Sequence, residues 1–135
     1  MPFEADLIPI LCTLMLGGAP EHPVPYSVGY DLHHIRVDCV TEDTVIEVGL
    51  DRRSSLDSVQ QALFAAHLTG KIPQVTLIDT DGREGPFEYR IRSAAKAANV
   101  DYAVYKLDFL TRWQMTHYLR NRPPPQPLTR KLAGG

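Results

Sequence analysis

The sequence predicts one small α/β domain in which a mixed β-sheet is flanked by helices. Its 135 residues are enough for one hydrophobic core and too few for two. Two alternating segments rich in β-branched residues, joined by a short polar turn, predict a β-hairpin. Strand-like and helix-like segments then alternate along the chain, an order typical of a mixed sheet whose faces are covered by helices.

The expected elements start with the hairpin, formed by residues 34 to 40 and 45 to 50. A helix follows near residues 56 to 69, with Ser54 or Ser55 as its N-cap and Gly70 at its end. The apolar face of this helix is expected at Leu56, Val59, Leu63 and Ala66. The remaining expected elements are strands at residues 74 to 79 and 102 to 107 and helices at residues 86 to 98 and 109 to 119.

Two stretches rich in proline predict extended arms on either side of the domain. Residues 17 to 29 contain three prolines and residues 121 to 135 contain four, and proline blocks regular structure. The α/β domain is therefore expected at residues 30 to 120, with an N-terminal arm at 1 to 29 and a basic C-terminal arm at 121 to 135. Because so short a core can bury only part of the arms, we expect them to contact other protein subunits, as in a virus particle.

The apolar segment from Leu7 to Leu16 is expected to pack as a helix or a strand. Glu4 and Asp6 precede it where a signal peptide carries positive charge, which leaves an uncleaved signal-like segment as the weaker alternative. The segment is too short to span a bilayer, so no membrane partner is expected.

Charge and cysteine content limit the expected partners. The net charge of -2 provides no broad basic field, so any contact with nucleic acid has to be local. Cys12 and Cys39 match neither a CxxC motif nor zinc-ligand spacing, which favours free thiols in a reducing compartment. We therefore expect a cytoplasmic protein or a component of a virus particle.

The hairpin is expected to place two carboxylates side by side. If Val40 pairs with Val45 across the turn, Asp38 lies opposite Glu47. Opposed carboxylates repel each other, and Glu47 lies in an otherwise apolar run where an unpaired charge is costly. A hard divalent cation such as Mg²⁺ or Mn²⁺ relieves both problems. Two alternatives remain: Arg36 or a helix residue neutralises the pair in a structural network, or a register shift of one residue turns the acids to opposite faces.

The arrangement resembles the PD-(D/E)xK nuclease superfamily, in which one hairpin strand carries an acid and the next carries an acid-x-lysine triplet. The matching residues are Asp38, after Val37, and the triplet Glu47, Val48 and Gly49. The resemblance covers roughly residues 30 to 107, and residues 58 to 64 look like the glutamine-plus-aromatic helix of exonuclease-type members. It implies a restriction-endonuclease-like fold with Mg²⁺ or Mn²⁺ held by Asp38, Glu47 and the backbone carbonyl of Val48.

The triplet departs from the family pattern because Gly49 stands where the lysine is expected. The group that orients the attacking water and stabilises developing charge is therefore missing from its usual place. Arg52 or Arg53 can supply positive charge, although an arginine stays protonated and cannot act as a general base. Gln60 is expected to face the sheet, where it either supports the metal ligands or substrate or is a buried amide that satisfies the backbone.

Two functions remain open at this point. The first is a metal-dependent phosphodiesterase or nuclease, with Asp38 and Glu47 as the catalytic acids, Arg52 or Arg53 at the scissile phosphate and Gln60 as a further contact. The second is a catalytically inactive nuclease-like domain that serves as a structural or assembly subunit. The retained acid pair favours the first function, and the missing lysine and the acidic net charge favour the second.

Overall fold

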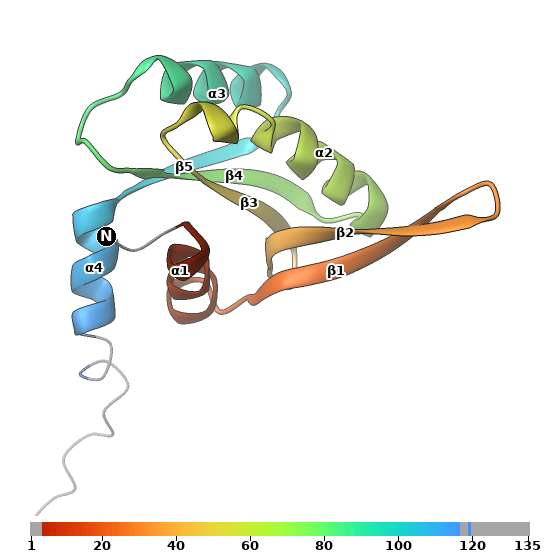
Figure 1. Cartoon of the computed structure of the whole chain (residues 1–135), viewed down its shortest axis with the longest axis horizontal. Helices are drawn as coiled ribbons and strands as arrows, with labels where there is room; N and C mark the ends of the chain where they lie inside the picture. Colours follow the sequence, from red (N-terminus) through yellow and green to blue (C-terminus); the bar gives the residue numbers. More distant parts are fainter. Residues whose placement is uncertain (1–3, 117–118, 120–135) are drawn as a thin grey trace, which may run out of the picture.

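A five-stranded mixed sheet forms the centre of the protein in a computed structural model that describes residues 4 to 116 and residue 119 (Figure 1). The strands follow one another across the sheet in sequence order. Antiparallel pairing joins the first three, and the last two run parallel to the third. The predicted α/β class with a small mixed sheet is confirmed. The strands are β1 (Ala19–Val28), β2 (Asp31–Val40), β3 (Thr44–Leu50), β4 (Ile72–Asp79) and β5 (Asp101–Lys106).

Helices cover both faces of the sheet. Figure 1 shows α2 and α3 on one face and α1 and α4 on the other. In the part of the chain that the structure describes, none of the helices is long and apolar enough to cross a membrane. The helices are α1 (Glu4–Pro9), which continues as the π-helical segment η1 (Ile10–Met15), the short 3-10 helix η2 (Arg53–Ser55), α2 (Ser58–Thr69), α3 (Pro86–Ala97) and α4 (Leu107–Met115).

The N-terminal segment belongs to the packed domain, so the expectation of an arm over residues 1 to 29 is wrong for its described part. Leu7, Leu11 and Cys12 are at most 2% exposed. They pack in one cluster with residues of β3, β4 and α4, among them Ile46, Ile78 and Leu110. A packed helix is one of the two forms predicted for the segment from Leu7 to Leu16.

Residues 19 to 28 form the edge strand β1 although three of them are proline. Proline is tolerated at the edge of a sheet because an outward-pointing N–H has no partner there to lose. The predicted block to regular structure between residues 17 and 29 is therefore wrong for this strand. The C-terminal arm predicted at residues 121 to 135 lies outside the described residues.

Cys12 and Cys39 form a disulfide between η1 and β2, which corrects the expectation of free thiols. Both side chains are fully buried. The N-terminal helix folds back across the face of the sheet to which Cys39 points, and this long-range packing brings the two sulfurs together. Gly18 packs tightly against the bridge, because a Cβ at this position would lie 2.7 Å from the Sγ of Cys39.

The helix α2 packs on a face different from the predicted one. Its buried residues include Val59, Ala62 and Ala65, whereas Leu63 is 40% exposed. The turn η2 precedes the helix, so that Asp57 is its N-cap and neither Ser54 nor Ser55 holds that position. The predicted end at Gly70 is confirmed, and this glycine has the left-handed backbone (φ 72°) that a helix end commonly requires.

Candidate functional site

The candidate site lies where β2 separates from β3. Among the described residues, their ladder pairs Cys39 with Ile46 and Val40 with Val45 and goes no further. The predicted register across the turn is therefore confirmed. Beyond this point β2 follows β1 into a long hairpin that projects from the rest of the sheet (Figure 1). Asp38 and Glu47 are the next residues along, so they face each other where main-chain pairing stops.

The side chain of Asp38 spans the gap between the two strands. Its Oδ2 accepts a hydrogen bond of 2.9 Å from the backbone N–H of Val48. The N–H and C=O groups of one strand residue point to the same edge, so the carbonyl of Val48 also faces this gap. The β2–β3 ladder ends before Val48, so among the described strands that carbonyl has no partner on this side.

Glu47 lies beside Asp38 and is only 6% exposed. Burial, followed by the neighbouring Asp38 carboxyl, raises the pKa of Glu47 to about 9. Burial also raises the pKa of Asp38, while the hydrogen bond from Val48 acts in the opposite direction. The two carboxyl groups therefore hold a proton between them at neutral pH unless another cation takes its place.

The two carboxyl groups open into a cavity of about 400 Å³ between β2, β3 and the start of α2. Arg36 and three serines are among the residues that line it. The guanidinium of Arg36 lies 3.6 Å from the carboxylate of Glu21. The lining residues are Ile35, Arg36, Asp38, Glu47, Val48, Ser54, Ser55, Ser58 and Gln61.

Gly49, the position of the missing lysine, packs directly against Ser55. A Cβ at Gly49 would lie 2.8 Å from the Cβ of Ser55 and would also clash with its hydroxyl. Ser55 is 5% exposed, and its carbonyl accepts a hydrogen bond of 2.6 Å from the hydroxyl of Ser58. Any side chain at position 49 therefore requires this turn to move, so the strand does not offer room for the family's lysine.

Three other residues predicted for the site lie outside it. Arg52 and Arg53 are exposed around the start of η2 and do not line the cavity. Gln60 is exposed, contrary to the expectation that it faces the sheet, and Gln61 lines the cavity in its place. The exposure of Gln60 and the position of Gln61 at the cavity have the same cause: the buried face of α2 is shifted by one residue from the predicted face. Arg36, expected only as a neutralising partner, is the cationic residue of the cavity wall.

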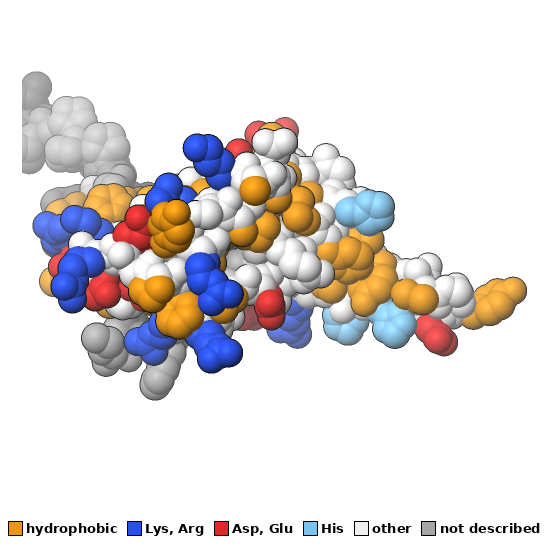
Figure 2. Space-filling view, turned by 90° about the horizontal axis from the view of Figure 1, so that it is seen from above, with side chains coloured by type: hydrophobic (Ala, Val, Ile, Leu, Met, Phe, Trp, Pro, Cys, Tyr) orange, Lys and Arg blue, Asp and Glu red, His pale blue; other side chains and the backbone are white. Residues whose placement is uncertain are grey.

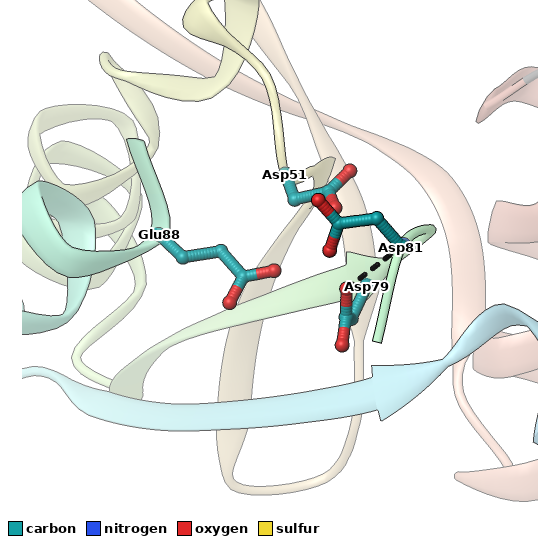
Figure 3. Close-up of side chains that lie close together, drawn as sticks. All are labelled: Asp51, Asp79, Asp81 and Glu88. Atoms are coloured by element: carbon teal, nitrogen blue, oxygen red, sulfur yellow. Dashed lines mark hydrogen bonds between the residues drawn. The ribbon is translucent and has the colours of Figure 1, made fainter. Parts of the chain in front are cut away.

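A second acidic group lies at the carboxyl ends of β3 and β4 (Figure 3). It consists of Asp51, Asp79, Asp81 and Glu88, and each offers a carboxylate oxygen within 4.8 Å of those of the others. None of the four is among the residues predicted for a site from the sequence. The available signal is that Asp51 and Asp79 each stand where a neighbouring parallel strand ends, at the edge where ligands of such sheets commonly bind.

Hydrogen bonds from the loop after β4 fix two of these carboxylates. Asp51 accepts from the backbone N–H of Thr80 at 3.0 Å and from the Thr80 hydroxyl at 2.8 Å. One oxygen of Asp79 accepts from the N–H groups of Asp81 and Gly82 at 3.1 and 3.0 Å. Glu88 is 3% exposed, and burial together with Asp79 raises its pKa to about 7.

No protein-family model matches the chain, and no curated protein or solved structure matches it. The geometry and charge of the two acidic groups are therefore the basis for assigning a function.

Proposed function

We propose that the chain is a divalent-cation-dependent phosphodiesterase whose site is the cavity at Asp38 and Glu47. The observation that supports this proposal most strongly is that the half-buried Asp38 and the buried Glu47 line one cavity together with Val48, whose N–H holds the Asp38 carboxylate. The two carboxylates and the carbonyl of Val48 are oxygen donors, which Mg²⁺ and Mn²⁺ prefer. They are also the three ligands that the resemblance to the PD-(D/E)xK superfamily implies.

The charge of the pair fits a divalent cation. Two carboxylates in a buried position are costly when both are ionised, and the raised pKa of Glu47 expresses that cost. A divalent cation offsets both negative charges, so that neither group needs a proton at neutral pH. When bound, such a cation polarises a phosphoryl oxygen and lowers the pKa of a water molecule. Asp38 holds its position for this role through the N–H of Val48.

The cavity wall favours a phosphodiester as the substrate. Arg36 presents a planar guanidinium group, which binds phosphate oxygens in a two-point geometry. Its side chain is 68% exposed, and its ion pair with Glu21 at 3.6 Å is of the weak surface type. A phosphate can therefore compete with Glu21 for this group. Ser54, which also lines the cavity, is a further polar residue at this wall.

A second candidate function, a non-catalytic binding or assembly module, is favoured by two observations. The first is the contact between Gly49 and Ser55, which leaves no room for the family's lysine. The second is the projecting β1–β2 hairpin, whose tip is hydrophobic in Figure 2 and carries Val28, Tyr30 and Leu32 at 60%, 108% and 79% exposure. Exposed apolar groups of this kind mark contact sites for other molecules.

Cleavage of single- and double-stranded DNA and RNA in Mg²⁺ or Mn²⁺ tests the first function. We expect metal-dependent hydrolysis that falls by roughly 100-fold or more in Asp38→Asn and in Glu47→Gln, because each change removes a direct metal ligand. Glu42→Gln is the matched control, since Glu42 lies exposed in the turn of the same hairpin. Arg36→Gln should weaken substrate binding more than turnover.

Undiminished hydrolysis by Glu47→Gln would refute the catalytic proposal. Absence of hydrolysis in every metal, with a folded wild-type protein, would favour the assembly module. In that case light scattering should show self-association or partner binding that a Tyr30→Ser, Leu32→Ser double variant abolishes, because these changes remove the apolar tip.

A further inference from the structure

We propose that Asp51, Asp79, Asp81 and Glu88 form a second divalent-cation site, distinct from the Asp38–Glu47 cavity, which takes an oxygen-coordinated ion of the Ca²⁺ type. The bound ion fastens the carboxyl ends of β3 and β4 to the first turn of α3. This site adds to the proposed function and does not depend on it.

The backbone around the four residues holds their carboxylates in place before any ion binds. The Thr80 hydroxyl and N–H groups fix Asp51, and two loop N–H groups fix one oxygen of Asp79. Asp81 accepts a hydrogen bond of 2.9 Å from the N–H of Arg83 through one oxygen. Each of these bonds leaves further lone pairs of the carboxylates for an ion.

Glu88 provides the independent observation that points to a ligand. Its side chain is 3% exposed, and its Oε1 has no hydrogen-bond partner among the described residues. Figure 3 shows this carboxylate directed toward Asp79 and Asp81. A buried acceptor without a partner costs free energy that a bound cation removes. Burial, followed by the charge of Glu88, raises the pKa of Tyr102 to about 12, and its hydroxyl is a second buried polar atom without a partner in the described part of the chain.

The charges of this group are not offset by ion pairs. In the described part of the chain, the ion pairs join Arg36 to Glu21 and Arg92 to Glu84, and neither involves the four acids. The N-terminus of α3 favours a negative charge at Glu88, but this effect is small compared with the repulsion among four carboxylates. A divalent cation neutralises half of that charge at the point where the oxygens converge.

The number of carboxylates distinguishes between ions. Mg²⁺ is usually held by one or two carboxylates and keeps several waters, whereas Ca²⁺ takes six to eight oxygen ligands in a more flexible geometry. Four carboxylates of one group therefore favour Ca²⁺. The exposed position of Asp81 gives the ion a path from solvent.

The two acidic groups are far enough apart to be tested separately. Glu47 and Asp51 are four residues apart along the β3 direction, which corresponds to about 13 Å in an extended strand. The contact of Gly49 with Ser55 lies between them. Removal of the Glu47 carboxylate therefore leaves the second group unchanged.

Thermal unfolding of the full chain in the Glu47→Gln background, with CaCl₂ or MgCl₂ as the only divalent salt, tests the proposal. We expect saturating Ca²⁺ to raise the melting temperature by roughly 5 °C or more, and Mg²⁺ to act only at higher concentration. Adding Glu88→Gln or Asp81→Asn should abolish the Ca²⁺ response. Glu88→Gln should also raise the melting temperature without metal, because it removes a buried carboxylate that its acidic neighbours repel.

Asp101→Asn is the matched control, because Asp101 is exposed at the opposite end of β5 and should leave the Ca²⁺ response unchanged. The proposal is refuted if Ca²⁺ fails to stabilise the Glu47→Gln protein. It is also refuted if the response survives in Asp81→Asn, an exposed and nearly isosteric change that remains informative even if Glu88→Gln does not fold. Nuclease assays of the wild-type chain address the first site independently, so the two proposals can fail separately.

Discussion

Reduction of the disulfide between Cys12 and Cys39 should remove a large part of the stability of this domain. The bridge joins residues that are 27 positions apart in sequence. In the chain-entropy description, a cross-link over a loop of this length stabilises the folded state by about 3 to 4 kcal/mol at 25 °C, by restricting the unfolded chain. Since small domains have unfolding free energies of about 5 to 15 kcal/mol, the reduced protein should be marginally stable.

Urea denaturation of the oxidised and reduced wild-type protein measures this difference. Reduction keeps both sulfur atoms, so most of the change arises in the unfolded chain. The dependence of the unfolding free energy on urea should also become steeper, because the reduced unfolded chain exposes more surface. A Cys12→Ala, Cys39→Ala double variant should lose somewhat more stability than reduction alone, because both side chains are fully buried and truncation leaves a cavity.

Thiol titration provides the independent check of the same reasoning. The native protein should expose no reactive thiol before reduction, since the described cysteines are both in the bridge. Detection of two free thiols after unfolding without reductant, together with equal urea midpoints in the presence and absence of reductant, would refute the assignment of a disulfide.

Two further predictions concern the candidate site. Without divalent cations, stability should decline as the pH rises from 4.5 toward 9, because Glu47 keeps in the folded chain a proton that it releases at its ordinary pKa of 4.5 when unfolded. Melting temperatures measured across this pH range should show the decline, and Glu47→Gln should make the decline smaller. A pH dependence of the melting temperature that is the same in Glu47→Gln would contradict the burial argument. Gly49→Lys is expected to lower the unfolding free energy by roughly 1 to 3 kcal/mol, because its Cβ meets Ser55, and to leave hydrolysis no faster. Urea denaturation measures its unfolding free energy, and cleavage assays measure its hydrolysis rate. A Gly49→Lys variant that is as stable as the wild type and more active would contradict the predicted clash with Ser55.

The local part of the fold could be predicted from the sequence because it depends on neighbouring residues. Alternation of apolar and polar residues predicts β2 and β3, and the short polar turn between them determines that Val40 pairs with Val45. The same register places Asp38 beside Glu47. Later strands and helices are observed close to their predicted ranges, since each has its own apolar pattern and a turn at its end.

The parts that depend on distant contacts could not be predicted in the same way. Proline in β1 indicates a break when the neighbouring strands are unknown, and it is compatible with a strand once β1 lies at the edge of the sheet. The disulfide depends on packing of the N-terminal helix against the sheet. Gln60 is exposed because the small residues Ala62 and Ala65 let the other side of α2 pack closely on the sheet. Hydrophobicity alone predicts instead that the larger Leu63 is buried.

The two acidic groups together explain why this domain should depend on cations. Glu47, Gly49 and Asp51 alternate along one face of β3 and its extension, so each group contains one acid from that face. A lysine at position 49 would lie between the groups and offset charge in both, but Ser55 occupies that space. In the described part of the chain, the two ion pairs lie outside both groups, although Arg36 lines the cavity of the first. Burial makes Glu47 and Glu88 costly to ionise, and no lysine can be placed at position 49, so protons or divalent ions can supply positive charge to both groups. Chelation of divalent ions above neutral pH, where protons are scarce, should therefore destabilise the domain more than chelation at acidic pH.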